Sequence, residues 1–202
     1  ALREAVEEVE SIVFFTVATH RHTIDYEWDR MPSVLGFDVW SQEEDRFLPP
    51  DVVERSYLAL GLDPVNTFQK EVRASDFQPD VSAIPQSAWY DGPAAGIVVR
   101  NKTGQRAKLS NPAIEDVVVE PISGSGTEVA DRFATADRFE SAEARLDRRG
   151  DAVTVDALLE SVLNSIVRSQ HHRLFHPAAD VDWESIRSAV AQRTQQYLSD
   201  SG

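Results

Sequence analysis

The sequence predicts an α+β protein, in which a region of antiparallel strands is followed by a small all-α domain. Three observations predict this class. Residues 12–17 and 34–40 are short runs of apolar and β-branched side chains, as in strands. Residues 96–109 have the pattern of a β-hairpin. Beyond residue 127, apolar residues recur at helical spacing.

The first elements come in the order helix, strand, strand. In residues 1–10 the apolar side chains have helical spacing with charges between them, which predicts a helix. We expect the strands at 12–17 and 34–40 to be buried and central in their sheet, because both are rich in Val, Ile, Leu and Phe.

A helix is predicted over residues 52–60, because two prolines and Asp51 precede it and Gly61 follows it. Asp51 is the expected cap. A short strand is expected at 65–68, and residues 71–93, rich in Pro, Asp and Ser, are expected to form a loop with at most one short element.

The hairpin is the clearest local prediction. Residues 96–100 form an apolar, β-branched run that ends in Arg100, residues 106–109 alternate basic and apolar side chains, and Asn101-Lys102-Thr103-Gly104 between them favours a turn. We therefore expect two antiparallel strands here.

The stretch Ser123-Gly124-Ser125-Gly126 reads as a flexible linker, and we place the domain boundary there. The predicted domains are 1–122 and 127–202. The second domain is expected to contain three helices, at 128–149, 154–168 and 182–198.

The composition is strongly acidic. The 202 residues include 34 Asp and Glu against 20 Lys and Arg, for a net charge of −14. The lysines are Lys70, Lys102 and Lys108. A carboxylate-rich, lysine-poor surface is typical of salt-adapted proteins, in which salt screens self-repulsion, so we expect partial unfolding in low salt. An ordinary acidic cytosolic protein is the alternative.

Several classes are excluded. The chain has no cysteine, so disulfides, thiolate zinc sites and thiol nucleophiles are absent. No apolar run reaches the ~20 residues that a membrane helix needs, and the first residues are no secretory signal. A cytoplasmic location is expected. Because the sequence lacks an initial methionine and begins inside an amphipathic stretch, it reads as a fragment of a longer protein.

Four cations, Arg100, Lys102, Arg106 and Lys108, lie within nine residues of the hairpin in an otherwise acidic chain. Side chains alternate along strands, so three of them can converge if the register allows. Convergent cations suit a triphosphate or another polyanion. The alternative is a set of solvated charges that protect an edge strand from aggregation.

Over roughly residues 12 to 110 the sequence resembles the RNA ligase branch of the covalent nucleotidyltransferases. The resemblance is carried by Phe15-Thr16-Val17, Arg21-His22-Thr23-Ile24-Asp25-Tyr26 and Gly36-Phe37-Asp38, and by Ala95-Gly96-Ile97-Val98-Val99-Arg100 followed by Arg106-Ala107-Lys108. It implies an antiparallel-sheet nucleotidyltransferase core, ATP-grasp-like in architecture, with ATP and Mg²⁺ as cofactors and RNA ends as partners.

The resemblance also implies roles for single residues. Phe37 would stack on adenine, although plain core packing is an equal alternative, and Gly96 would belong to the nucleotide-binding motif. Arg100, Arg106 and Lys108 would contact the ATP phosphates. Lys108 and Arg106 are the candidate catalytic residues, because they would stabilise charge on the transferring α-phosphoryl group.

The sequence departs from the family at three places. Glutamates expected at Val17 and Ala95 are missing, and no lysine stands in a Lys-x-Asp-Gly context. Lys70, followed by Glu71-Val72-Arg73, is no substitute for that nucleophile. We expect the motif within roughly a hundred residues upstream, a span that would complete an ordinary domain.

The histidines can be interpreted as structural or as functional residues. His20 and His22 could form a metal pair, but no third ligand stands beside them, so no metal site is predicted. An RNA-facing or structural role is favoured. His171, His172 and His176 form a basic cluster with Arg173, which could contact an RNA backbone or cap a helix.

Three functional hypotheses follow. The favoured one is part of an ATP-dependent RNA ligase that adenylylates itself and seals RNA ends, as in RNA repair, with this chain alone lacking the nucleophile. The second is a non-catalytic nucleotide- or RNA-binding module derived from the ligase fold. The third is a halophilic protein whose hairpin cations only balance local acidity. RNA or DNA as substrate, and the oligomeric state, stay open.

Overall fold

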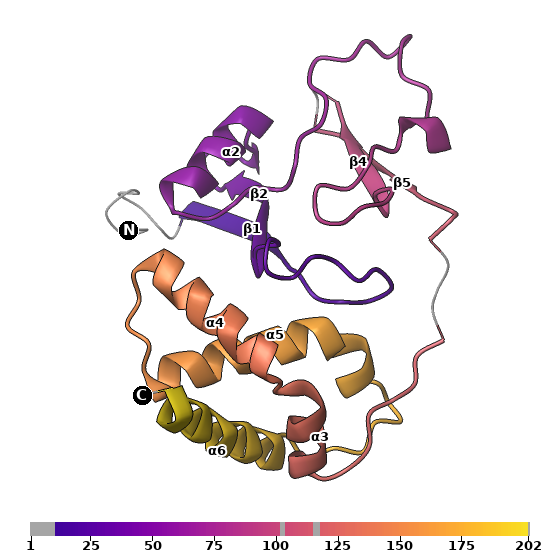
Figure 1. Ribbon diagram of the computed structural model, residues 1–202. Helices are drawn as coiled ribbons and strands as arrows, with labels where there is room; N and C mark the ends of the chain where they lie inside the picture. The colour runs from indigo at the N-terminus through magenta and orange to yellow at the C-terminus, as the bar shows by residue number, and fades with distance from the viewer. Residues whose placement is uncertain (1–10, 102–103, 115–117, 202) are drawn as a thin grey trace. The chain divides into compact units, whose positions relative to one another are not determined.

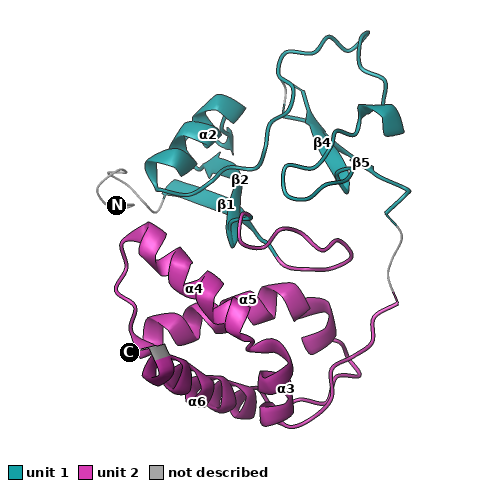
Figure 2. Ribbon diagram, viewed as in Figure 1, with its two compact units in different colours: residues 1–19, 31–115 teal, residues 20–30, 116–202 magenta. Residues whose placement is uncertain are grey.

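The computed structural model describes residues 11–101, 104–114 and 118–201. The helix predicted over 1–10 lies outside these residues. The chain divides into two compact units, coloured separately in Figure 2. Of the described residues, unit 1 contains 11–19 and 31–114, and unit 2 contains 20–30 and 118–201.

Unit 1 contains a three-stranded antiparallel sheet in the order β1-β2-β3. The strands are β1 (Ile12–Ala18), β2 (Val34–Ser41) and β3 (Arg46–Phe47), drawn in Figure 1. Both predicted strands are confirmed, and β2 is central. The predicted burial of β1 is wrong, because Val13, Phe15 and Val17 are 48%, 42% and 45% exposed. An apolar run cannot tell an edge strand from a central one.

Helix α2 (Pro50–Ala59) packs against β2 and confirms the predicted helix. Its N-cap is Pro49 rather than Asp51, which lies in the first turn. Tyr57 on α2 is fully buried and forms the core of unit 1 with Val39 and Val53.

Gly36 on β2 permits this packing, because a Cβ at that position would lie 2.2 Å from Cγ of Tyr57. The strand predicted at 65–68 is wrong. The chain makes one parallel bridge there, between Gly36 and Pro64, and then leaves the sheet.

The hairpin is confirmed as β4 (Gly96–Arg100) and β5 (Arg106–Ser110), a separate two-stranded sheet. The loop before it contains one 3₁₀ turn, η2 (Val81–Ala83). At the hairpin turn, the Asn101 side chain hydrogen-bonds the side chain and the backbone N–H of Gln105 at 2.7 and 2.8 Å.

Unit 2 is helical, with α3 (Gly126–Phe133), α4 (Ala136–Arg149), α5 (Val155–Leu174) and α6 (Trp183–Ser201). The helix predicted over 128–149 is split in two at Ala134 and Thr135. The Nε of Arg193 on α6 donates to the Ala134 carbonyl at 3.1 Å, so tertiary contacts satisfy the interrupted backbone. The helices bury a continuous apolar core.

The predicted flexible linker is wrong. Ser125 caps α3 in a capping box, in which its hydroxyl accepts from the Glu128 N–H at 3.3 Å and the Glu128 carboxylate accepts from the Ser125 N–H at 2.8 Å. A Cβ on Gly126 would lie 2.3 Å from the Ser185 backbone. The glycines therefore serve close packing rather than mobility.

Residues 20–30 belong to the helical unit, whereas the sequence-based division placed them in 1–122. The Arg21 N–H donates to the Arg168 carbonyl at 2.7 Å, and Arg145 pairs with Asp29 at 2.7 Å. The Arg168 guanidinium lies 5.3 Å from the Trp28 ring centroid. This segment is thus fixed to α4 and α5 by hydrogen bonds, an ion pair and an aromatic contact.

The α+β class, with antiparallel strands before helices, is therefore confirmed. Among the described residues, no helix is both long and apolar enough to cross a membrane.

Candidate functional site: the arginine cluster of unit 1

The hairpin register brings three basic residues to one face. Arg100 lies opposite Arg106, and Lys108 lies opposite Val98, two residues from Arg100. Residues directly opposite on antiparallel strands share a face, as do residues two apart on one strand. Arg100, Arg106 and Lys108 therefore share one face of the sheet, the arrangement that the sequence required for a phosphate site.

The two arginines converge on the carboxylate of Asp38, which is nearly fully buried on β2. Arg100 Nη1 lies 3.4 Å from Oδ1, and Arg106 Nη2 is in close contact with Oδ2. Arg100 Nη2 also donates to the Phe37 carbonyl at 2.9 Å. Asp38 thus ties the central strand of one sheet to the hairpin.

Sequence reasoning used Asp38 only as part of a motif and assigned it no role. The available signal was its position: a carboxylate between Phe37 and Val39 in an apolar strand needs a buried cation or hydrogen-bond donors. Which cations those were depended on the pairing of the hairpin with β2.

Each arginine also lies over an aromatic ring. The Arg100 guanidinium is 4.7 Å from the Phe37 centroid, and the Arg106 guanidinium is 3.9 Å from the Phe47 centroid. Such contacts contribute about 0.5–2 kcal/mol each. One face of Phe37, the predicted adenine platform, is therefore already covered by Arg100.

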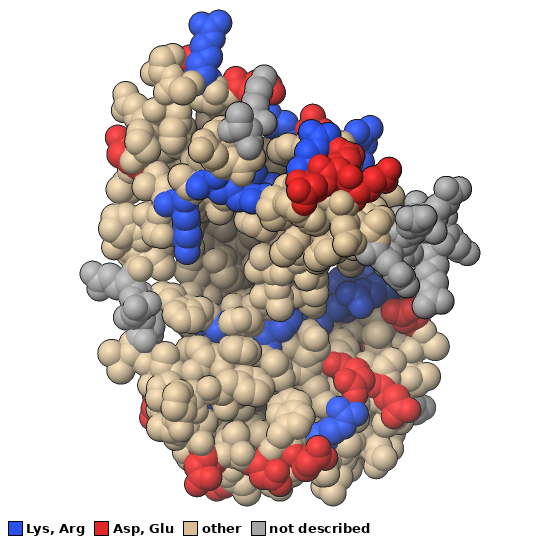
Figure 3. All heavy atoms as spheres, turned by 180° about the vertical axis from the view of Figure 1, so that it is seen from behind, with Lys and Arg blue, Asp and Glu red and all other residues tan. Residues whose placement is uncertain are grey.

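The cluster carries an excess of positive charge, with two guanidinium groups around one carboxylate. Burial lowers the pKa of Arg100, Asp38 raises it, and Arg106 lowers it further. Lys108 is exposed and has no ion-pair partner among the described residues. The chain as a whole is acidic, with a net charge of −14, and on the face drawn in Figure 3 the carboxylates form several separate groups.

The Tyr57 side chain on α2 hydrogen-bonds the backbone of Asp38. Its hydroxyl donates to the carbonyls of Phe15 and Asp38, at 2.7 and 3.0 Å. Burial raises the pKa of Tyr57, and the Asp38 charge raises it further, so the phenol stays protonated and remains a donor.

Gly96 begins β4 where the two strands approach closely, since a Cβ there would lie 2.4 Å from the Leu109 carbonyl oxygen. The close approach of the two strands therefore explains a glycine at this position without any ligand. Ala95 is exposed, and its carbonyl accepts from the Asn111 N–H at 2.8 Å. Val17 lies on β1, paired with Leu35.

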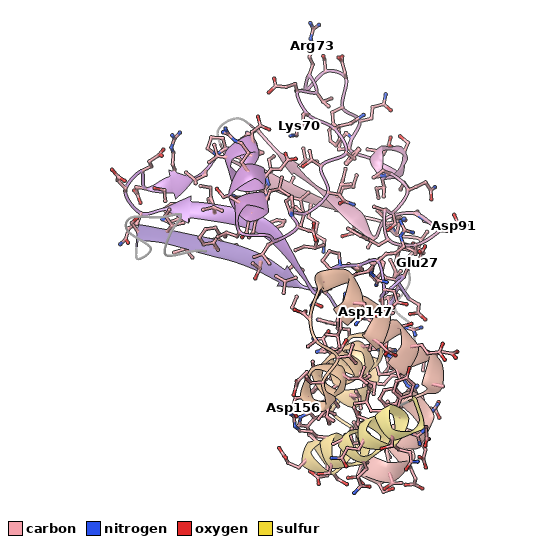
Figure 4. All side chains as sticks on the ribbon, turned by 60° about the vertical axis from the view of Figure 1, so that its left-hand side comes forward. Glu27, Lys70, Arg73, Asp91, Asp147 and Asp156 are labelled. Carbon is pink, nitrogen blue, oxygen red and sulfur yellow. The ribbon has the colours of Figure 1, made fainter. Side chains whose placement is uncertain are left out.

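Lys70 lies beside α2 (Figure 4), where its ammonium pairs with Asp51 at 2.9 Å and Glu54 at 2.8 Å. The hydrogen bonds that Lys70 donates to Glu54 and Asp51 raise the pKa of Lys70. A nucleophilic lysine needs the opposite shift, because it must lose its proton near neutral pH. The pocket of about 430 Å³ that Lys70 lines also contains Asp63 and Trp89. The geometry gives Lys70 the properties of a surface ion pair.

The described residues contain no group of three or more His, Cys, Asp or Glu that could hold a metal ion. Both carboxylate oxygens of Asp38 point to arginines. The cluster therefore suits an anion, and its own carboxylate does not fit a Mg²⁺ ligand. His20 and His22 lie in unit 2, near the other histidines.

Comparison with protein-family models, with curated proteins and with solved structures gives no match to this chain.

Proposed function

We propose that this chain is part of an ATP-dependent, RNA ligase-like nucleotidyltransferase, in which the arginine cluster binds the phosphates of ATP. The observation that carries the proposal is the common hairpin face of Arg100, Arg106 and Lys108, which has a net positive charge beside the Phe37 ring. The finer fold assignment, an ATP-grasp-like nucleotidyltransferase core, belongs to the same proposal.

The arginines are held ready for an anion. Asp38 fixes both guanidinium groups without neutralising both charges, so each keeps N–H donors that can bind phosphate oxygens. A fixed cation costs no reorganisation when charge develops on the α-phosphoryl group. Arg106 would supply a fixed charge, and the exposed ammonium of Lys108 would move to the phosphate.

Adenine binding would require Arg100 to share Phe37. The guanidinium covers one face of the ring at 4.7 Å, so a purine would stack on the opposite face or displace Arg100. The chain's residues then orient the nucleotide. Mg²⁺, held by the phosphates and by groups outside this cluster, would supply further charge neutralisation.

The proposal places the nucleophilic lysine outside this chain. Lys70 is ion-paired and its pKa is raised, and Lys108 lies on the phosphate-binding face, in a Arg-Ala-Lys sequence rather than Lys-x-Asp-Gly. The full-length protein would form a lysine-AMP intermediate with release of pyrophosphate and transfer the AMP to the 5′-phosphate of an RNA end. AMP would then leave as a 3′-hydroxyl attacks that phosphate and joins the ends.

ATP binding by the chain tests the proposal. Lys108→Ala removes a cation without touching the Asp38 pairs, so the fold should remain intact. Loss of one charge-assisted contact, worth about 1.5–3 kcal/mol, should weaken ATP binding about 10- to 100-fold in calorimetry at high salt. Arg73→Ala, at the exposed loop tip labelled in Figure 4, is the matched control and should leave affinity unchanged. Equal affinities for both variants would refute the phosphate site.

The second candidate is a non-catalytic nucleotide- or RNA-binding module. It is favoured by Val17 and Ala95 at the positions of the missing glutamates, and by the single carboxylate of the cluster, which both arginines occupy. Incubation of the full-length gene product with ATP labelled at the α-phosphate separates the two. Covalent lysine-AMP supports the ligase, and ATP binding without adduct supports the module.

A further inference from the structure

All five histidines of the chain gather in unit 2. His20 and His22 come from the segment 20–30, His171 and His172 from the last turn of α5, and His176 from the turn after it. The rings of His20 and His171 are stacked, with centroids 3.7 Å apart. Four of the five, all except His20, line one pocket.

This histidine pocket has a volume of about 260 Å³. Phe175, an aromatic residue that is 58% exposed, forms part of its wall and lies 4.9 Å from the His171 ring. The volume is slightly below the ~300 Å³ at which drug-sized ligand pockets begin, so it suits a group the size of one nucleotide rather than a folded partner. An exposed aromatic ring is a stacking platform for a nucleobase.

Two arginines carry positive charge beside the histidine pocket, and two polar atoms there are unpaired within the described part of the chain. His172 Nδ1 and Arg21 Nε are buried without a hydrogen-bond partner among the described residues. Arg21 and Arg173 face His172, and their charges are balanced in part by Asp25 and Glu120, at 2.7 and 3.9 Å.

Two imidazoles of the pocket, His171 and His172, have lowered pKa values. Burial lowers the pKa of His171, and His20 and His22 lower it further. Burial also lowers the pKa of His172, with Arg21, Arg173 and His22 acting in the same direction and Asp25 against it. Protonation below neutral pH therefore adds positive charge to the pocket, and a bound anion would favour that protonation.

We propose that the histidine pocket binds one nucleotide of a single-stranded nucleic acid, with the base on Phe175 and the phosphate against His172 and His22. A duplex is disfavoured, because a chain with a net charge of −14 attracts a long phosphate backbone poorly. That the strand is RNA rests on the proposed function of unit 1.

The test uses a labelled six-nucleotide RNA and fluorescence anisotropy at high salt. Affinity should rise several-fold from pH 7.5 to pH 6, with folding checked by circular dichroism at both values. Phe175→Ala should weaken binding roughly tenfold, in line with the loss of one base-stacking contact. Phe68→Ala, which truncates an exposed ring of unit 1, is the matched control and should have no effect.

Three further measurements determine which ligand the pocket binds. Inorganic phosphate should compete weakly; competition as strong as that of the oligonucleotide would overturn the stacked base and leave a phosphate site only. Tighter binding of a duplex of the same sequence, or equal binding by Phe175→Ala, would overturn the proposal. DNA binding equal to RNA binding would keep the pocket and remove the RNA assignment.

ATP affinity is measured in the same samples. Phe175→Ala should leave ATP binding unchanged. A chain that binds the RNA through Phe175 but does not bind ATP supports the histidine pocket and refutes the ligase proposal, so the two failures are distinguishable.

Discussion

Unit 1 and unit 2 are stabilised in different ways. Unit 2 buries a continuous apolar core drawn from α3 to α6. The fully buried cluster of unit 1 is small, with Val39, Val53 and Tyr57 at its centre, and the hairpin is tied to it through Asp38. In unit 1 polar ties therefore carry a larger share of the stability.

The arginine cluster of unit 1 and the histidine pocket of unit 2 differ in how their charge depends on pH. The arginines of unit 1 are charged at every physiological pH, so their partial burial requires the carboxylate of Asp38. The histidines of unit 2 can be buried uncharged, and within the described part of the chain none of the four that line the pocket forms an ion pair with a carboxylate. A permanent charge thus becomes a structural tie, whereas a titratable one leaves the pocket responsive to pH.

The largest expected effect is that of Asp38→Asn, which removes the shared carboxylate and leaves two partly buried guanidinium groups. Breaking a buried ion pair costs about 3–5 kcal/mol. Urea unfolding at high salt should show that loss. The exposed Asp91→Asn is the control and should change the free energy of unfolding by less than about 0.5 kcal/mol. A neutral Asp38→Asn would show that unit 1 does not depend on this tie.

Gly36→Ala is expected to come next. The new methyl group would lie 2.2 Å from Cγ of Tyr57, so the ring must leave its place under β2 and lose its hydrogen bonds to Phe15 and Asp38. Overpacking of this kind costs about 1–3 kcal/mol. Gly104→Ala is a useful comparison, because its φ of 84° strains an alanine without any atom to clash with. If both variants unfold at the same urea concentration, packing against Tyr57 is not the cause.

Ser125→Ala should have a smaller effect, and this effect is expected in unit 2. It removes the capping-box hydroxyl of α3 and should cost about 1 kcal/mol. Hydrogen exchange in the first turn of α3 measures it, and Ser123→Ala, two residues earlier, serves as the control. Unchanged exchange protection would instead support the flexible linker that the sequence predicted for this stretch.

The smallest expected effect is the pH dependence of unit 2. Because the pKa values of His171 and His172 are lowered in the folded state, the unfolded chain binds more protons below its own histidine pKa of about 6.5. Stability is therefore full above that pH and falls as the pH drops below it toward the folded pKa values. Exchange protection of α5 should decrease from pH 7.5 to pH 5.5, and less so in the double variant His171→Gln with His172→Gln.

Local patterns predicted most elements of the fold. The β4–β5 hairpin follows from strand alternation and the Asn101 turn, and α2 from its prolines and Gly61. The exposure of β1 was not predictable, because the sequence IVFFTV is equally compatible with an edge strand and with a central strand. The break between α3 and α4 was also missed, since apolar spacing continues across Ala134, and the contact from Arg193 that satisfies the Ala134 carbonyl comes from a distant helix.

By itself, the sequence determined the α+β class, the order of the main elements, the acidic surface and the cationic hairpin, because alternation, turn residues and charge are local properties of the chain. Only the tertiary structure decided which carboxylate holds Arg100 and Arg106, that His20 stacks on His171, and that His22 meets residues 171–176 in one histidine pocket. Those contacts join residues far apart in the chain, and their register depends on how whole elements pack, which no local pattern specifies.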